Sequence, residues 1–367
     1  MEYKNYILPL VALITSLLFT CIAMPWLLKF CKRKGLYDRP DERKVHTNNI
    51  PRLGGSVFVP AMLVGMSTSL FLINQQSEGL PLLKISTFLI FTGILIIYLI
   101  GLLDDLLGLP ARFKFIVQFI AALFLPFCGL YINNMYGLFG LNELPMYIGY
   151  PITIFLNLLI VNSINLIDGI DGLASGISVI ALIAYLLLFS TLGVVSYTIF
   201  AAALIGAVVV FMYYNLFGNI KKGTKTFMGD TGSLILGYAL AYLTIKYAMY
   251  NPHVLPYRPY ALIIACTFLI IPIFDLIRVA FTRLLNKKSI FHPDKTHIHH
   301  LCMNAGLSMR MTLVIILTLQ LLFVLVNYLL IMINLQSTLI LLFDIVIFSV
   351  FILIIKKQSR VQSTRTH

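Results

Sequence analysis

The chain has 367 residues, of which 59% are hydrophobic and 11% are charged, and its mean hydropathy is +0.93. This composition excludes a soluble globular protein and indicates an integral membrane protein, because a water-exposed surface needs many more charged residues. The net charge of +13 is explained by basic loops attracted to anionic lipid headgroups, so it requires no nucleic-acid partner.

Apolar runs of helical length predict an all-α integral membrane protein with about eleven transmembrane helices, in a single polytopic domain over residues 1–367. Residues 131–148, rich in tyrosine, asparagine and glycine, predict a short periplasmic hairpin. The apolar runs lie at 6–30, 54–73, 83–103, 112–130, 149–166, 173–190, 196–217, 232–250, 259–281, 311–333 and 337–355.

The basic residues predict the orientation of these helices. With an odd number of spans, the segments on one side hold 21 of the 27 lysines and arginines. Since positive loops stay in the cytoplasm, the N-terminus should be periplasmic and the C-terminus cytoplasmic. The segments predicted to face the cytoplasm are 31–53, 104–114, 167–172, 218–231, 282–310 and 356–367.

A polar cluster follows the fifth run, and ionisable side chains at membrane depth indicate a functional site. Steps of three residues turn an α-helix by 300°, so four such side chains cannot all face one ligand on an unbroken helix. We therefore predict that the helix ends near Asp168, where Gly169 and Gly172 permit it, and that a divalent cation balances the carboxylates. The cluster consists of Asn162, Asn165, Asp168 and Asp171.

Other acids lie on the same predicted side. Asp104 and Asp105 end the third run, and because adjacent helical side chains diverge, one can face a site while a neighbour holds the other. Asp230 precedes Thr231 at the start of a helix, whose N–H groups favour a metal–phosphate unit. The alternative for this pair is an ordinary helix N-cap. Phe227 either stacks on a base or packs internally.

Basic side chains in the first cytoplasmic loop are candidates for binding phosphate. Arg43, Lys44 and Arg52 either perform this task or anchor the loop to headgroups.

A later segment contains three histidines near Arg283: His297, His299 and His300. The segment lacks the HExxH spacing of zinc proteases, and histidines that bind phosphate fit the surroundings better. By contrast, Asp275 near Arg278, and Asp344 in the last run, are expected to be satisfied by internal partners.

These stretches together resemble the polyprenyl-phosphate N-acetylhexosamine-1-phosphate transferases, in the undecaprenyl-phosphate GlcNAc-1-phosphate branch of glycosyltransferase family 4. The HIHH form is similar to this branch, whereas the phospho-MurNAc-pentapeptide branch usually has HHH and a PTMGG turn. The motifs are PRLGG at 51–55, DD at 104–105, NSINLIDGIDGLA at 162–174, FMGDTGSLILG at 227–237 and SIFHPDKTHIHH at 289–300.

The resemblance implies transfer of GlcNAc-1-phosphate from a UDP-N-acetylhexosamine to undecaprenyl phosphate at the cytoplasmic face of a bacterial inner membrane, with release of UMP. It implies Mg²⁺ as cofactor, with Mn²⁺ as a substitute, and leaves a homodimer open. By this resemblance, the metal is held by Asn165 and Asp230. The implied catalytic residues are Asp104, Asp105, Asp168, His297, His299 and His300. The implied substrate-binding residues are Lys44, Asn162, Asp171, Phe227 and Arg283.

Three alternatives remain at the level of sequence: the phospho-MurNAc-pentapeptide branch, a cation or proton transporter, and an intramembrane metallohydrolase. A transporter would place its acids near the bilayer midplane on broken helices. Here the acids are predicted at the inner ends of spans, which favours the transferase. Which N-acetylhexosamine is used does not follow from the sequence.

Overall fold

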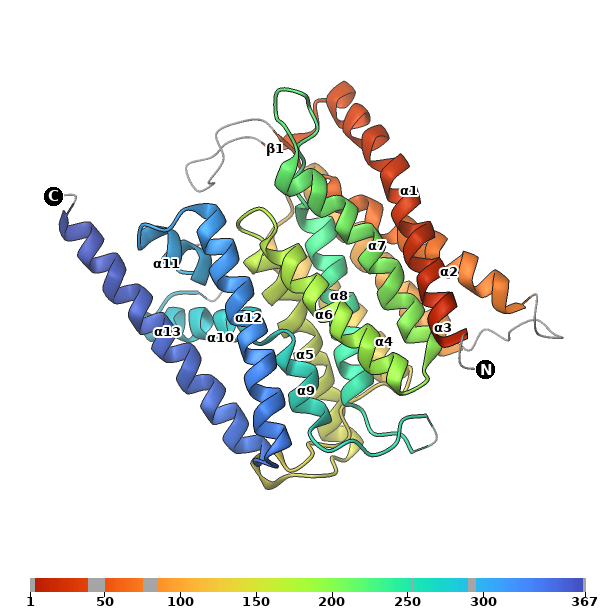
Figure 1. Ribbon diagram of the computed structural model, residues 1–367, viewed down its shortest axis with the longest axis vertical. Coiled ribbons are helices and arrows are strands. Elements are labelled where there is room, and N and C mark those ends of the chain that lie inside the picture. Colours follow the sequence, from red (N-terminus) through yellow and green to blue (C-terminus); the bar gives the residue numbers. More distant parts are fainter. Residues whose placement is uncertain (1–3, 39–49, 75–84, 253, 290–294, 366–367) are drawn as a thin grey trace. The chain divides into compact units, whose positions relative to one another are not determined.

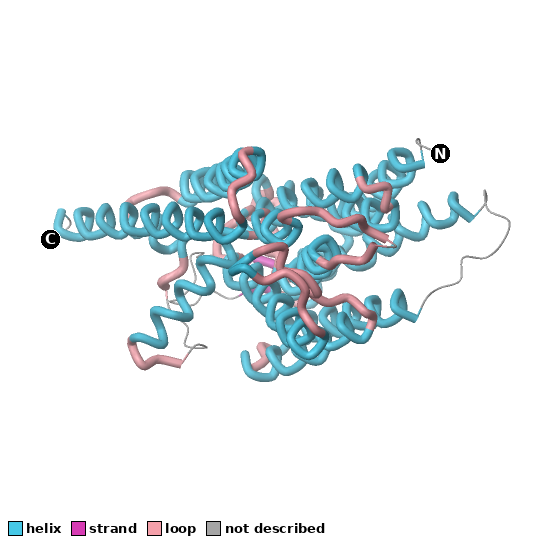
Figure 2. The backbone as a smooth tube through the Cα atoms, turned by 90° about the horizontal axis from the view of Figure 1, so that it is seen from below, coloured by secondary structure: helices cyan, strands magenta, loops and turns pink. Residues whose placement is uncertain are grey.

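The computed structural model describes residues 4–38, 50–74, 85–252, 254–289 and 295–365 (Figure 1). Figure 2 shows helices almost throughout these ranges, which confirms the all-α prediction. The helices are α1 (Lys4–Lys34), α2 (Phe58–Asn74), α3 (Ile85–Leu107), α4 (Ala111–Phe127), α5 (Met146–Ile167), α6 (Leu173–Thr191), α7 (Val195–Phe217), α8 (Gly229–Ala248), α9 (Ala261–Thr267), α10 (Ile270–Leu285), α11 (Ile298–Asn304), α12 (Met309–Met332) and α13 (Ser337–Arg365).

Short non-helical elements connect them. Two-residue strands β1 (Tyr37–Asp38) and β2 (Ile50–Pro51) pair antiparallel, and the short 3₁₀ helices are η1 (Gly54–Val57) and η2 (Leu138–Gly140). Residues 131–145 make a hairpin-like excursion with one antiparallel bridge between Asn134 and Glu143, as the turn-rich sequence predicts.

Eight of the described helices are long and apolar enough to cross a membrane, and a ninth span arises if α9 and α10 count as one. The protein is therefore a multi-pass membrane protein. The two other predicted spans correspond to α4, which has 17 residues, and α8, which carries Asp230 in its first turn and Lys246 in its last. The count of eleven and the orientation stay predictions.

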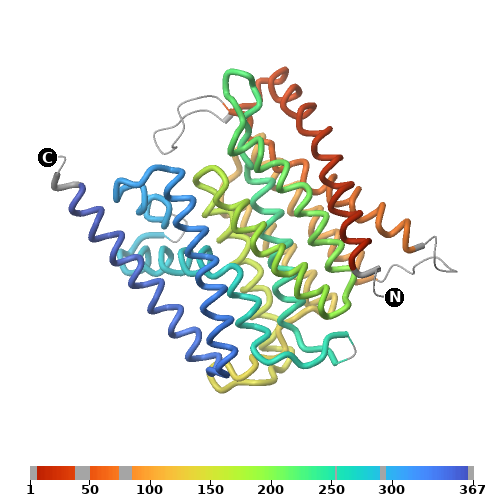
Figure 3. The backbone as a smooth tube through the Cα atoms, in the orientation of Figure 1, coloured from red at the N-terminus to blue at the C-terminus, as the bar shows by residue number. Residues whose placement is uncertain are grey.

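The chain divides into two compact units, one of residues 1–130 and 178–243 and the other of residues 131–177 and 244–367. In the first unit α1 lies alongside α7, and α2 packs against both (Figures 1 and 3). Small residues make this close packing possible: a Cβ on Gly206 would lie 2.4 Å from the Leu13 carbonyl oxygen. The Ser16 hydroxyl donates across the interface to the Ala203 carbonyl at 2.6 Å. Membrane helices associate through such contacts because lipid supplies no hydrophobic driving force between them.

In the second unit the helix path breaks between α9 and α10, which are bent by 82°. Non-helical backbone at membrane depth must be satisfied within the protein. Gln320 of α12 does this, because its amide donates to the Thr267 carbonyl at 2.9 Å and its oxygen accepts from the Ile271 N–H at 3.3 Å. Asn327 donates to Thr267 Oγ1 at 2.8 Å and to Asp344 Oδ2 at 2.9 Å. The expectation that Asp344 has an internal partner is confirmed.

Candidate active site

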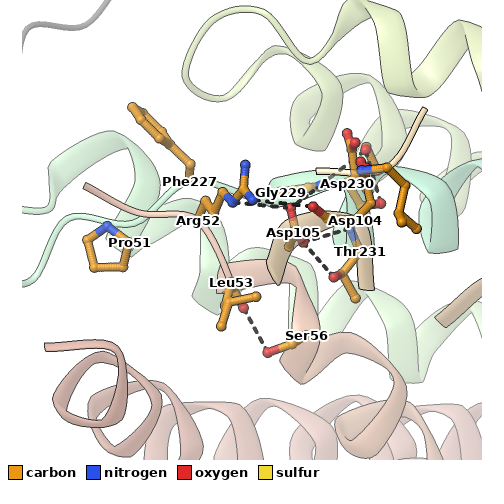
Figure 4. A network of polar contacts seen from close by, with 12 residues as sticks. Pro51, Arg52, Leu53, Ser56, Asp104, Asp105, Phe227, Gly229, Asp230 and Thr231 are labelled. Atoms are coloured by element: carbon orange, nitrogen blue, oxygen red, sulfur yellow. Dashed lines mark hydrogen bonds and ion pairs between the residues drawn. The ribbon is translucent and has the colours of Figure 1, made fainter. Parts of the chain in front are cut away.

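The carboxylate of Asp105, near the end of α3, caps the N-terminus of α8. Its Oδ1 accepts from the Asp230 N–H at 2.9 Å, and its Oδ2 accepts from the N–H and hydroxyl of Thr231 at 3.0 and 2.6 Å (Figure 4). A helix N-terminus presents unpaired N–H groups and partial positive charge, so it stabilises a buried anion. The predicted anion-binding N-terminus of α8 is therefore present, and an acid from another helix occupies it.

The turn at 51–55 is joined to the segment before α8 by backbone hydrogen bonds. Phe227 N–H donates to the Pro51 carbonyl at 2.8 Å, Gly54 N–H to the Phe227 carbonyl at 3.0 Å, and Gly55 N–H to the Met228 carbonyl at 2.8 Å. These hydrogen bonds join the PRLGG and FMGD segments into one structural element. In the view of Figure 4 the ring of Phe227 lies on the side of Arg52 away from Asp105.

Two further features fix Asp105. Arg52 places its Nε 4.0 Å from Oδ1 of Asp105 and donates to the Asp104 carbonyl at 3.3 Å. Gly229 has φ +72°, and a Cβ there would lie 2.0 Å from the Arg52 carbonyl oxygen and 2.5 Å from Oδ2 of Asp105. Only glycine combines this backbone angle with such close approach. Arg52, a candidate for phosphate in the sequence, thus also neutralises Asp105.

Asp104 faces a different partner. Its Oδ1 accepts from the Leu109 N–H at 2.6 Å, and its Oδ2 lies 2.7 Å from Nζ of Lys114 on α4. The same ammonium lies 2.7 Å from Oδ2 of Asp230. One cation therefore holds two carboxylates that are far apart in the chain. The two acids thus have different neighbours, as expected from the divergence of adjacent helical side chains, and the prediction that one of them faces a catalytic site stays a prediction.

Lys114 is the residue of this centre that sequence reasoning missed. Its signal is the position of a lysine in the first turn of the helix that follows the DD pair, within reach of the end of α3. A lysine near a span end is commonly explained as a topological anchor, and that explanation hid its contact with two acids. Thr231 was noted only as a possible cap, and its hydroxyl is an additional donor to Asp105.

In the second unit, α5 ends at Ile167 with Asp168 as its C-cap (φ −74°, ψ +54°). The prediction that this helix stops near Asp168 is confirmed. Gly172 has φ +79°, which reverses the chain before α6, and all four members of the predicted polar cluster are half-buried. Asn162 donates from Nδ2 to the Leu158 carbonyl of its own helix at 2.8 Å. Gly169 serves a different purpose, since a Cβ there would lie 2.1 Å from Nε2 of His299.

The three histidines lie next to one another, as predicted. The ring centroids of His299 and His300 are 4.3 Å apart, and those of His297 and His299 are 6.2 Å apart with nearly parallel planes. Burial, and then the charge of His300, lowers the pKa of His299 to about 3. His299 is therefore neutral near pH 7 and cannot contribute a positive charge.

Asp275 of α10 is paired with Arg278 and His297, which confirms that it is satisfied internally and gives it a specific neighbour. Arg283 is buried near the end of the same helix. Lys44, and with it Arg43 and Asp294, lies outside the described residues. Among the residues that the structure describes, no group of three or more His, Cys, Asp or Glu side chains is arranged to hold a metal.

The structure thus brings together Asp104, Asp105 and Asp230 in the first unit. In the second unit it brings together the histidines and Gly169, the residue that follows Asp168. Lys114 joins the buried carboxylate of Asp104 to the partly exposed carboxylate of Asp230. Phosphoryl transfer relies mainly on charged groups that neutralise and position anions. Fold and site together define a multi-pass membrane protein with a polar centre of aspartates and a lysine.

Comparisons with known proteins identify the family. A family model described as glycosyl transferase family 4 matches residues 87–248. A "probable undecaprenyl-phosphate N-acetylglucosaminyl 1-phosphate transferase" of Bacillus subtilis (strain 168) is 33% identical over 307 residues, covering 83% of this chain and 80% of that relative. An undecaprenyl-phosphate alpha-N-acetylglucosaminyl 1-phosphate transferase of Yersinia pestis is 30% identical over 77% of this chain and 73% of its own length. The corresponding protein of Escherichia coli (strain K12) is 28% identical over 83% and 79%. The chain belongs to glycosyl transferase family 4.

Proposed function

We propose that this protein transfers GlcNAc-1-phosphate from UDP-GlcNAc to undecaprenyl phosphate. The observation that carries the proposal is the centre formed by Asp104, Lys114 and Asp230, next to the capped carboxylate of Asp105. All four residues lie inside the segment that matches the family model. The names of the relatives supply the acceptor lipid and the sugar phosphate. The UDP donor follows from the family resemblance.

In the proposed reaction a phosphate oxygen of undecaprenyl phosphate attacks the β-phosphorus of UDP-GlcNAc. A new P–O bond forms to the lipid phosphate, and the bond from the β-phosphorus to the oxygen of UMP breaks, so that UMP leaves with its electron pair. The lipid phosphate has a second pKa of about 6 and is mostly dianionic at neutral pH. It therefore needs charge neutralisation more than a strong general base.

The carboxylates support direct attack rather than a covalent aspartyl intermediate. Both oxygens of Asp104 accept hydrogen bonds, from Leu109 N–H and Lys114, and both oxygens of Asp105 accept from the start of α8. A carboxylate whose oxygens are all engaged is a poor nucleophile and a good positioning group. Trapping a sugar-phosphate adduct on Asp104 or Asp105 would contradict the direct route.

Mg²⁺ is the proposed cofactor, and Asp230 is the described side chain that would hold it. Mg²⁺ prefers carboxylate oxygens and keeps several waters. The Asp230 side chain is 32% exposed, and the Lys114 ammonium contacts both Asp230 and Asp104. When bound, the ion would neutralise the phosphates of the donor. The role of Asn165 as a second ligand, and that of Mn²⁺ as a substitute, stay predictions.

The remaining assignments belong to the same proposal. We propose a bacterial inner-membrane protein of eleven spans, in which α4, α8 and the bent pair of α9 and α10 complete the eight long apolar helices. The excess of lysine and arginine on one set of loops supports a periplasmic N-terminus and a cytoplasmic active site. A reporter fusion that places the HIHH segment in the periplasm would contradict this orientation.

The decisive experiment incubates purified protein with Mg²⁺, undecaprenyl phosphate and UDP-GlcNAc labelled in the sugar. The expected result is labelled lipid and one UMP per turnover, with none from Asp230→Asn. A panel of UDP-sugars distinguishes the donors. Inactivity with UDP-GlcNAc together with turnover of a UDP-sugar that lacks the 6-hydroxyl would overturn the choice of GlcNAc. Cation flux without lipid-linked product would favour the transporter alternative.

A further inference from the structure

Asp275 forms a buried carboxylate–histidine pair with His297 in the second unit, and no role has been assigned to this acid. Asp275 lies on α10 with its side chain 2% exposed, and His297 is the N-cap residue of α11. Oδ2 of Asp275 lies 2.9 Å from Nδ1 of His297. The Ile298 N–H donates to both carboxylate oxygens at 3.1 and 3.2 Å. These contacts fix the start of α11 against α10.

The other partner of Asp275 makes the carboxylate a pure acceptor. Arg278, one turn away on α10, donates to Oδ1 at 2.6 Å and to the Thr296 carbonyl at 2.6 Å. A neighbouring guanidinium favours the ionised carboxylate, which has no hydrogen to give. The hydrogen between Asp275 and His297 must therefore be on Nδ1, and this selects one imidazole tautomer.

The same bond leaves the other ring nitrogen for a different task. Nε2 of His297 is buried and, within the described part of the chain, has no hydrogen-bond partner. A buried polar atom left without a hydrogen bond is destabilising. Gln320 of α12 shows the usual arrangement for a buried structural group, since its amide nitrogen and its amide oxygen both have partners. Nε2 of His297 has none within the described residues, so it is available to a ligand.

We propose that Asp275 is a positioning residue that fixes the tautomer and ring orientation of His297, so that Nε2 is the atom that meets a phosphate group of the substrate. This inference rests on the proposed function for the identity of the ligand. An Nε2–H of an imidazolium would donate to an anionic phosphate a hydrogen bond about twice as strong as a neutral one.

The change Asp275→Asn tests this with little change in shape. The charged Arg278 should keep its hydrogen bond to the one oxygen that remains in the new side chain. The NH₂ group of that side chain then faces Nδ1 of His297. Nδ1 must then be the acceptor, and the hydrogen moves to Nε2. We expect kcat to fall about 10- to 100-fold, the usual effect of removing a carboxylate that orients a functional histidine. Asp275→Glu should recover part of the loss, since it restores a carboxylate.

A double-variant comparison separates positioning from general damage. If Asp275 acts through His297, Asp275→Asn combined with His297→Gln should be no slower than His297→Gln alone. Multiplied losses would show an independent role and would overturn the proposal, as would unchanged kcat in Asp275→Asn. Asp344→Asn is the control, because it also neutralises a buried helical acid, whose side-chain partner is Asn327 rather than a histidine. It should remain within twofold of wild type.

A spectroscopic readout does not depend on activity. In protein labelled with ¹⁵N-histidine, proton–nitrogen correlations of the imidazole ring distinguish the two tautomers, and His297→Gln identifies the signal. We expect the Nδ1–H tautomer in wild type and the Nε2–H tautomer in Asp275→Asn. A wild-type ring without hydrogen on Nδ1 would overturn the inference. If wild-type protein forms no lipid-linked product, the proposed function fails, and this measurement still decides the role of Asp275.

Discussion

Lys114 supplies the positive charge between two acids, and replacing it should expose their repulsion. In Lys114→Met the Oδ2 atoms of Asp104 and Asp230, each 2.7 Å from Nζ, lose their shared cation. These oxygens are no more than about 5.4 Å apart, and at an effective dielectric constant of about 20 two unit charges at that distance repel by about 3 kcal/mol. Solvent screens part of this, because the Asp230 side chain is 32% exposed. We expect a net destabilisation of about 2–3 kcal/mol, between the values for exposed and buried pairs.

The assay is thermal unfolding in detergent, with and without Mg²⁺. Without Mg²⁺ the variant should unfold several degrees below wild type. Because the variant site carries one more net negative charge, half-maximal stabilisation should need about tenfold less Mg²⁺, which corresponds to about 1.4 kcal/mol. Lys222→Met, in an exposed loop, changes the net charge equally and should behave as wild type. Lys114→Arg should retain most of the stability. The reasoning is wrong if Lys114→Met unfolds at the wild-type temperature, or if Mg²⁺ stabilises both proteins alike.

Three further changes test other contacts. Thr231→Val removes the hydroxyl that donates to buried Asp105 at 2.6 Å, so it should lower the unfolding free energy by about 1–3 kcal/mol and reduce activity. Thr231→Ser keeps the hydroxyl and should retain both stability and activity. Equal stability of the two variants would contradict the role of this hydroxyl in capping. Gly55→Ala places a Cβ 2.2 Å from the Gly232 Cα, so it should destabilise the protein by about 1–3 kcal/mol or more; wild-type unfolding temperature would show that the 51–55 turn is loosely held. The pKa of His299 is lowered by burial to about 3, so below pH 6.5 the unfolded chain binds a proton that the folded chain does not. Stability should therefore fall by about 1.5 kcal/mol from pH 6.5 to pH 5 on account of this residue, and His299→Gln should remove that part of the pH dependence; identical pH profiles would refute the shift.

The centre around α8 illustrates where sequence reasoning reached its limit. The DD pair predicts that one acid is held and the other faces a site, because adjacent helical positions diverge. Which acid is held depends on where the N-terminus of α8 lies, and the sequence of α3 contains no information on that. The structure assigns Asp105 to the helix N-terminus and Asp104 to Lys114.

Asp275 in the second unit has one partner that the sequence predicts and one that it does not. Asp275 is unremarkable in sequence because an acid three residues before an arginine is expected to form a local helical pair. That pair does form. The additional partner, His297, is 22 residues away and becomes visible only when α10 and α11 pack together.

The sequence by itself determined the class of the protein, the helical content, the end of α5 at Asp168 and the candidate residues. These follow from local physics: apolar length for lipid, backbone freedom at glycine, and the cost of charge at membrane depth. Only the tertiary structure decided the partners, namely Lys114 between two acids, Asp105 on the N-terminus of α8 and Asp275 behind His297. Partner choice depends on distances between segments remote in the chain, and those distances are set by packing of the whole unit rather than by any one stretch of residues.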